Sequence, residues 1–218
     1  MKRVKRLAGV PPPILDEVRL LQGVNVLAAQ DTDLAGIAAR FGPPPLWERP
    51  TGFATLIFII LEQQVSLASA KAAFVKLQTA LGEVEPHLLL TLSDDELKAI
   101  GFSRQKTRYA RLLAEAVRDG QLDFAQLHEL DDDGVRTALT RLKGIGVWTA
   151  DCYLLMALRR PDVWPHGDLA LAVAWQRLKQ LPERPSYAAL GMVAERWRPW
   201  RAVAARLLWH NYLSEKKS

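Results

Sequence analysis

The chain has 218 residues, of which 49% are hydrophobic, and it carries a net charge of +5. This apolar content can bury a core in one domain or in two closely packed subdomains, which excludes a largely disordered chain. The positive charge is compatible with a polyanionic partner such as nucleic acid, and equally with an ordinary basic protein.

The single cysteine, Cys152, excludes an intrachain disulfide, a cysteine-based zinc site and an iron–sulfur cluster, all of which need more thiolates. The apolar run from Phe53 to Leu61 is far shorter than the ~18 residues that span a bilayer. The basic segment 1–6 is not followed by the apolar core of a signal peptide. We therefore expect an intracellular protein in a reducing compartment, with no membrane association.

Helix-capping residues recur along the whole chain and no run of alternating strands is found, which predicts an all-α fold. Residues 11–50 hold two short helical patterns between the proline clusters 11–13 and 43–45. A strongly apolar helix is predicted from Thr51 to Leu61, where three polar residues at 62–64 interrupt it.

Three further helices are predicted from their caps. Ser66 begins a helix over 66–81, a capping box begins a short helix over 93–101, and Ser103 begins an amphipathic helix over 103–120.

The next pair of helices frames a glycine-containing turn. Asp131, Asp132 and Asp133 place carboxylates in the first turn of the helix that enters it, where they complement the helix dipole. The helix that leaves it, over 147–158, is apolar nearly all round and should be central to the core. Further helices are predicted near 169–179, 187–197 and 200–213.

The turn itself reads Leu-Lys-Gly-Ile-Gly-Val-Trp-Thr-Ala over 142–150, and Asp168 follows twenty residues after Trp148. Two glycines flanking one apolar residue indicate a hairpin with positive φ, a conformation that glycine adopts at little cost. Its backbone amides, together with the positive end of the following helix dipole, form a site suited to a phosphate group.

Three blocks of the sequence carry a resemblance to a known family: 61–66, the hairpin through 165–168, and 196–200 through Trp209. In this order they resemble the helix-hairpin-helix (HhH-GPD) DNA glycosylases, and within them the 3-methyladenine DNA glycosylase II, or AlkA-type, group. The resemblance implies two helical subdomains with the active-site cleft between them. It makes residues 1–218 a single glycosylase unit, with a central bundle over 51–165 that contains the hairpin 142–148. A second lobe is then built from 1–50 plus 166–218.

Asp168 follows a glycine and precedes an apolar helix, so the plainer interpretation is a helix N-cap. In the family that the chain resembles, the matching aspartate is the catalytic carboxylate, and the two roles are compatible. Breaking an N-glycosidic bond builds oxocarbenium character on the sugar, which a nearby anion stabilises. A base alkylated at N3 or N7 already carries positive charge and leaves without a general acid, so a single carboxylate suits such bases.

Trp148 stands where bifunctional members of the superfamily hold a lysine nucleophile, which implies a monofunctional enzyme that stops at an abasic site. The resemblance makes Trp148 and Trp209 facing walls of the base pocket, which Cys152 and Phe53 complete. Cys152 departs from the family because some relatives present a tyrosine there. Core packing is the alternative interpretation of Trp148 and of most of the other tryptophans.

Gln64 matches the family's wedge, the side chain that fills the gap left in the duplex by the extruded base. The alternative is a solvent-exposed kink. Gln63 is expected to be a supporting contact beside this wedge. Further DNA contacts are expected at the hairpin, from Lys143, Gly144, Gly146 and Thr149, with Lys143, which replaces a proline common in relatives, at a phosphate. Relatives often bind a monovalent cation through hairpin carbonyls, and the matching positions here are Thr140, Leu142 and Gly144. Beyond this structural Na⁺ or K⁺, no cofactor is expected.

The leading hypothesis is therefore a monofunctional DNA glycosylase of base excision repair. It would act as a monomer on double-stranded DNA and excise alkylated bases of the 3-methyladenine or 7-methylguanine type. One alternative is a glycosylase for deaminated or oxidised bases, although the missing lysine and cysteines argue against the oxidised-base branch. The other is a non-catalytic helix-hairpin-helix protein that only binds DNA, against which Asp168 at the family's spacing argues.

Overall fold

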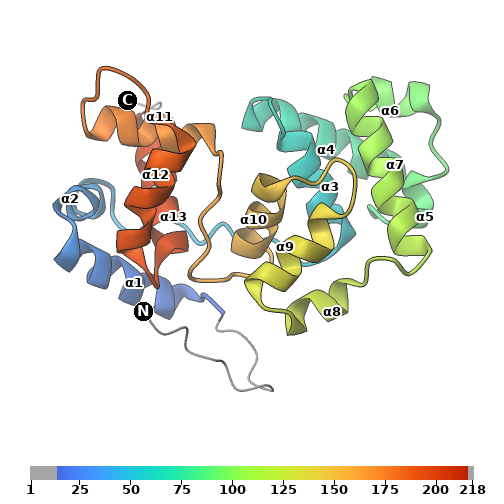
Figure 1. Cartoon of the computed structure of the whole chain (residues 1–218). Helices are drawn as coiled ribbons and strands as arrows, with labels where there is room; N and C mark the ends of the chain where they lie inside the picture. Colours follow the sequence, from blue (N-terminus) through green and yellow to red (C-terminus); the bar gives the residue numbers. More distant parts are fainter. Residues whose placement is uncertain (1–13, 216–218) are drawn as a thin grey trace.

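The computed structural model describes residues 14–215, and within this range the chain is entirely helices and loops, as predicted (Figure 1). The described helices are α1 (Glu17–Gln30), α2 (Thr32–Phe41), α3 (Phe53–Glu62), α4 (Leu67–Leu81), α5 (Pro86–Leu89), α6 (Asp94–Ile100), α7 (Arg104–Arg118), α8 (Phe124–Glu129), α9 (Asp132–Thr140), α10 (Val147–Met156), α11 (Leu169–Leu178), α12 (Tyr187–Ala194), the 3₁₀ turn η1 (Glu195–Trp197) and α13 (Arg201–Glu215). None of them has the length and apolar character needed to span a bilayer.

The helices form two groups that lie side by side in Figure 1. Helices α3 to α10 pack among themselves, and α1, α2, α11, α12, η1 and α13 form the second group from the two ends of the described chain. The chain passes between the groups in two connecting segments, residues 42–52 and 157–168. The predicted lobe boundaries at residues 50/51 and 165/166 fall inside these segments. The fold thus has two helical subdomains, and the boundaries themselves stay a prediction.

Side-chain caps fix where four of the predicted helices begin. The hydroxyls of Ser66, Ser93 and Ser103 and the carboxylate of Asp131 each accept a hydrogen bond from the backbone N–H three residues later. The carboxylate of Glu96 accepts the backbone N–H of Ser93, which completes the predicted capping box. The three serine caps are confirmed, because a capping side chain satisfies an orphan donor wherever the helix then packs. Asp131, expected in the first turn with Asp132 and Asp133, lies one residue before it, as the N-cap of α9.

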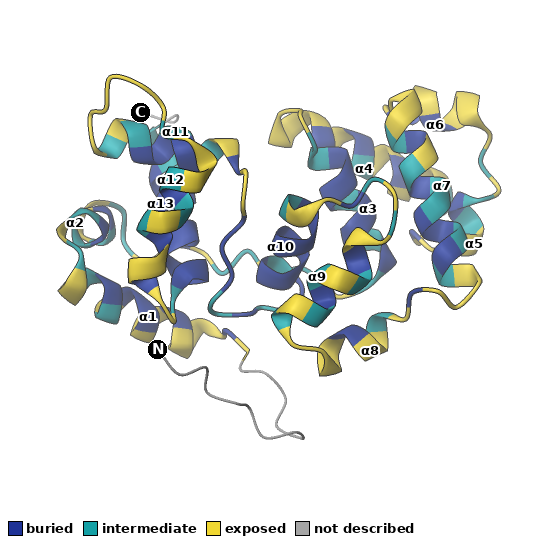
Figure 2. Ribbon diagram, in the orientation of Figure 1, coloured by how far each residue is buried: buried dark blue, intermediate teal, exposed yellow. Residues whose placement is uncertain are grey.

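The core is built around α10 and α13, whose inner residues are buried (Figure 2). Every residue over 149–155 of α10 is buried, in keeping with its apolar sequence. The helix ends at Met156, two residues before the predicted end. The short helices α5 and α8 were not predicted.

Arg206 of α13 lies between the two subdomains and has no exposed surface. Its guanidinium donates to the carbonyl oxygens of Leu46 at 2.8 Å, Leu155 at 2.8 Å and Ala202 at 3.1 Å. Burial lowers the pKa of Arg206 to about 9. Leu46 belongs to the first connecting segment and Leu155 to the last turn of α10, so one buried side chain joins α13 to both.

Candidate active site

Asp168 lies at the start of α11, at the end of the second connecting segment, and is 8% exposed. Its Oδ1 accepts the backbone N–H of Leu171 at 2.8 Å, so the N-cap interpretation is confirmed. The same carboxylate accepts two indole N–H groups, from Trp148 to Oδ2 at 2.9 Å and from Trp209 to Oδ1 at 3.1 Å. Capping therefore leaves the carboxylate available for further polar contacts.

The two indole donors come from different subdomains, since Trp148 is on α10 and Trp209 is on α13. Their N–H groups and the amide of Leu171 all point at the oxygens of Asp168. An ionised carboxylate only accepts hydrogen bonds, and three donors match that form. The site thus holds one oriented carboxylate at the place where the two helix groups meet.

Cys152 lies one helical turn after Trp148 and is buried. Burial raises the pKa of its thiol well above the usual value, and the Asp168 carboxylate adds to this shift. The thiol is therefore neutral and is not an activated nucleophile. Phe53, at the start of α3, is also buried, and its place in the base pocket stays a prediction.

Trp47, in the first connecting segment, packs against the indole of Trp209, with ring centroids 6.4 Å apart and planes at 71°. This edge-to-face geometry is a favoured aromatic arrangement. The sequence analysis missed Trp47, because nothing local relates a loop residue to a helix more than 150 positions later in the chain. Trp47 fixes the ring of Trp209 from the side of the connecting segment.

The hairpin between α9 and α10 lies where the sequence predicts it, but only one of its two glycines has a positive φ. Gly144 has φ +97°, and a Cβ there would overlap the ring of Tyr109 on α7. Gly146 has φ −89° and ψ 178°, which is extended backbone open to other residues, and a Cβ there would meet open space. The expectation of positive φ is therefore wrong for Gly146. This residue is the N-cap of α10, and no side chain at this position caps the amides of the first turn.

Gln63, in the turn between α3 and α4, is tied to the hairpin. Its Nε2 donates to the carbonyl oxygen of Gly144 and to Oγ1 of Thr149, both at 3.0 Å. Thr149 as a whole residue is only 1% exposed, so its predicted contact with DNA stays a prediction. Gln64, next in the chain, is exposed and has φ +57°, in the left-handed region. The two glutamines therefore differ: the side chain of Gln63 is held against the hairpin, whereas Gln64 is exposed to solvent.

Lys143 is exposed at the tip of the hairpin, as a phosphate contact requires. Of the predicted cation ligands, the carbonyl of Leu142 accepts the N–H of Ile145 at 3.1 Å, and that of Gly144 accepts the amide of Gln63. Each carbonyl oxygen has a second lone pair, so these bonds do not block the predicted Na⁺ or K⁺ ion, and the site stays a prediction together with Thr140. Within residues 14–215, His, Cys, Asp and Glu side chains form no group of three that could hold a metal ion.

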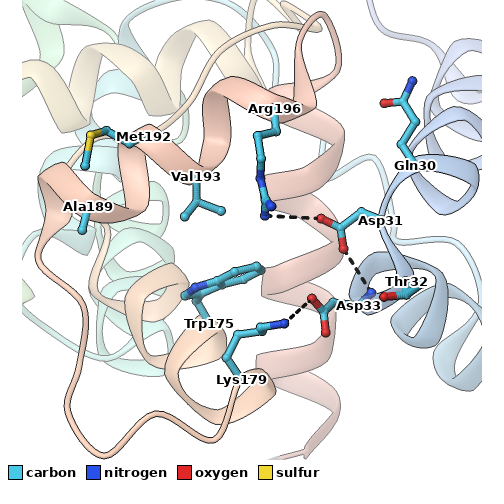
Figure 3. Close-up of a pocket in the computed structure, with 10 residues that line it drawn as sticks. All are labelled: Gln30, Asp31, Thr32, Asp33, Trp175, Lys179, Ala189, Met192, Val193 and Arg196. Atoms are coloured by element: carbon cyan, nitrogen blue, oxygen red, sulfur yellow. Dashed lines mark hydrogen bonds and ion pairs between the residues drawn. The ribbon is translucent and has the colours of Figure 1, made fainter.

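A cavity of about 670 Å³ lies at the other end of α11 from Asp168, between the α1–α2 junction and α12 (Figure 3). Trp175 and Val193 contribute apolar surface to it. Its charged groups are paired within the protein, with Lys179 Nζ 2.8 Å from Asp33. Asp168 is not among its lining residues, so this cavity is separate from the candidate active site.

Comparison with solved structures finds a DNA-3-methyladenine glycosidase from Bacillus halodurans that is 31% identical, with a TM-score of 0.73 over 90% of this chain and 91% of that one. A Schizosaccharomyces pombe 3-methyladenine DNA glycosylase (Mag1), in complex with abasic DNA, shares the fold with a TM-score of 0.81 at 24% identity, over 89% of this chain and 97% of that one. Among curated sequences, DNA-3-methyladenine glycosylase 1 of Schizosaccharomyces pombe is 27% identical over 180 residues, which are 81% of this chain and 79% of the relative.

The family described as "HhH-GPD superfamily base excision DNA repair protein" matches residues 57–200. This range includes three parts of the candidate site: the α3–α4 turn, the hairpin and Asp168. The chain belongs to the HhH-GPD superfamily of base excision DNA repair proteins.

Proposed function

We propose that this protein is a monofunctional DNA glycosylase that removes alkylated bases of the 3-methyladenine or 7-methylguanine type from double-stranded DNA. It acts inside the cell as a monomer and leaves an abasic site. The observation that carries the proposal is the Asp168 carboxylate, held by indole N–H groups from both subdomains, with Trp148 in place of a lysine nucleophile. The names of its relatives from Bacillus halodurans and Schizosaccharomyces pombe support the substrate class.

The carboxylate of Asp168 stabilises the positive charge that develops on the deoxyribose as the N-glycosidic bond breaks. Three N–H donors already fix its position in the free protein, so little reorganisation is needed when that charge appears. The base departs with the electron pair of the broken bond, and a water molecule then adds to the anomeric carbon and releases one proton to solvent, which leaves the abasic sugar. A cationic alkylated base becomes neutral as it leaves and needs no protonation.

The indole rings of Trp148 and Trp209 select for such bases. Because their N–H edges point at Asp168, the rings are held in fixed orientations beside the carboxylate. A cationic base over an indole face gains about 1–2 kcal/mol of cation–π attraction. A neutral base does not gain this attraction. The same rings therefore orient the carboxylate and discriminate in favour of a charged base.

DNA is held at the two turns beside the site. The uncapped amides of the α10 first turn and the exposed Lys143 bind phosphate, which positions the duplex without reading its sequence. The exposed Gln64 enters the duplex and hydrogen-bonds the base left without a partner. A Na⁺ or K⁺ ion on the carbonyls of Thr140, Leu142 and Gly144 would stiffen the hairpin.

The direct test compares three duplex substrates: methylated DNA, uracil-containing DNA and 8-oxoguanine-containing DNA. Release of methylated bases, with little release from the other two, supports the proposal. Release of only uracil or 8-oxoguanine would contradict the proposal and indicate a glycosylase for deaminated or oxidised bases instead. A protein that binds all three duplexes and cleaves none would be a DNA-binding member of the superfamily.

Because Trp148 replaces the lysine, strand scission is not expected. Incubation with methylated duplex should yield abasic sites on intact strands, and borohydride should trap no covalent protein–DNA adduct, since no amine forms a Schiff base. Denaturing electrophoresis before and after alkali treatment measures both. A bifunctional glycosylase with its own substrate is the positive control for trapping, and an adduct with this protein would contradict the monofunctional assignment.

Gly146→Asp is expected to weaken binding to damaged and undamaged duplex alike, by about tenfold at physiological salt, because a carboxylate is placed where phosphate binds. The free protein should keep its stability, since the backbone at Gly146 is extended and a Cβ meets open space. Fluorescence anisotropy over a range of salt concentrations measures the binding.

The matched control is Gly146→Ala, which adds the Cβ without the charge. It should reproduce the stability of Gly146→Asp and lose less affinity. Unchanged binding by Gly146→Asp would contradict the phosphate site at the hairpin.

A further inference from the structure

Asp151 on α10 is fully buried, and the mechanism above does not use it. Its Oδ1 accepts the Nε–H of Arg136 on α9 at 2.6 Å. Its Oδ2 accepts the backbone N–H of His166 at 3.2 Å and lies 3.3 Å from Nδ1 of the same residue. This carboxylate therefore contacts both a helix and a loop outside its own helix.

These contacts join three parts of the candidate site. Arg136 belongs to the helix that enters the hairpin, and Asp151 to the helix that leaves it, three residues after Trp148. His166 lies two residues before Asp168, separated from it only by Gly167, which has φ +83°. Since the backbone N–H of His166 is the atom held, the contact fixes the path of the main chain into Asp168.

A buried carboxylate is costly, and an apolar residue of similar size often stabilises a fold at least as well. Asp151 is nevertheless placed in a helix whose other residues over 149–155 are buried and mostly apolar. The ion pair with Arg136 compensates the negative charge of Asp151. The second carboxylate oxygen accepts the backbone N–H of His166, in the segment that leads to Asp168. Core packing alone gives no reason for this arrangement.

We propose that Asp151 is a positioning residue for base excision: it holds the main chain at His166 against α10, so that the Asp168 carboxylate stays within reach of the Trp148 and Trp209 indoles. The inference rests on the proposed function. It assigns Asp151 no contact with DNA. A displacement of about 1 Å at a catalytic group can cost about 10²-fold in rate, which makes such a restraint measurable.

The test compares Asp151→Ala with Asp31→Ala. Asp31 is a matched control in the other helix group because its carboxylate also accepts a backbone N–H, that of Asp33, and also faces an arginine, Arg196 at 3.7 Å. It accepts the indole N–H of Trp197 at 2.9 Å, which gives this variant its own resonance to follow. Two quantities are measured for each folded variant: the single-turnover rate of excision from methylated duplex, and the indole ¹H–¹⁵N resonances of the tryptophans. Affinity for a duplex with a stable abasic analogue is measured alongside.

For Asp151→Ala we expect the Trp148 and Trp209 indole resonances to shift and the single-turnover rate to fall by about 10²-fold. Affinity for the abasic duplex should change by less than about threefold, because phosphate contacts are kept. For Asp31→Ala we expect only the Trp197 resonance to shift, with the excision rate unchanged. Asp151→Asn keeps the size of the side chain and one acceptor oxygen for His166, so it should recover part of the excision rate. It replaces Asp151→Ala in the test if that variant does not fold.

The proposal requires both effects in the same variant. Folded Asp151 variants that lose rate without moving the Trp148 and Trp209 resonances, or that move them at wild-type rate, would overturn it. Failure of the proposed function is seen separately, as a wild-type protein that releases no methylated base. The indole resonances report the restraint on Asp168 even then.

Discussion

Asp168→Asn is expected to lower base excision by about 10²-fold or more while the protein stays folded. Asparagine removes the negative charge that faces the developing oxocarbenium, and such stabilisation in a closed site is worth several kcal/mol. Its carbonyl oxygen can keep the bonds to Leu171 and Trp209, but its amide then faces the N–H of Trp148. The lost bond should reduce the free energy of unfolding by about 1–2 kcal/mol. Single-turnover kinetics and denaturant unfolding measure the two effects.

Binding of the variant to damaged DNA should survive, because phosphate contacts and stacking do not use this carboxylate. Asp16→Asn is the matched control, since Asp16 also caps a helix, accepting the N–H of Arg19 at 2.7 Å, and is exposed away from the site. It should excise at the wild-type rate. If Asp168→Asn did so as well, Asp168 would be a helix cap alone.

Gly144→Ala is expected to have the largest effect on stability, a loss of about 3 kcal/mol or more in the free energy of unfolding. An L-residue at φ +97° costs about 1–2 kcal/mol, and the overlap of its Cβ with the Tyr109 ring adds packing strain of about 1–3 kcal/mol. Because the hairpin would be displaced, DNA affinity should fall too. Denaturant unfolding and anisotropy are the measurements.

Gly146→Ala is again the control and should lie within about 0.5 kcal/mol of the wild type. A double-mutant cycle with Tyr109→Ala separates the two causes, since removing the ring relieves the overlap but not the backbone strain. Equal losses for Gly144→Ala and Gly146→Ala would mean that the hairpin conformation described here is wrong.

The helix boundaries were largely predictable because their signals are local. Ser66 and Ser103 act on amides three residues away, so the cap can be recognised without knowing the fold. Helices α5 and α8 were missed because segments of four and six residues show no hydrophobic period. The two-subdomain arrangement came from the family resemblance.

The site was predictable in its residues but not in its geometry. The family resemblance placed Asp168, Trp148 and Trp209 together, yet it does not reveal that the indole edges, and not only their faces, meet the carboxylate. Asp151 was missed, although an aspartate within an apolar helix is a signal that could have identified it. The positive φ expected at Gly146 failed because one glycine, Gly144, completes the turn and the other opens the next helix.

The bonds of Arg206 bear on how the protein can vary over evolution. Every acceptor of its guanidinium is a main-chain carbonyl, at Leu46, Leu155 and Ala202. A carbonyl is present whatever side chain the residue carries, so neighbouring positions can be substituted without removing a partner. The three hydrogen bonds of Arg206 thus do not depend on which side chains stand at these positions. Residues around Asp168 can therefore change without removing a hydrogen-bond partner of the side chain that joins α13, which carries Trp209, to α10, which carries Trp148.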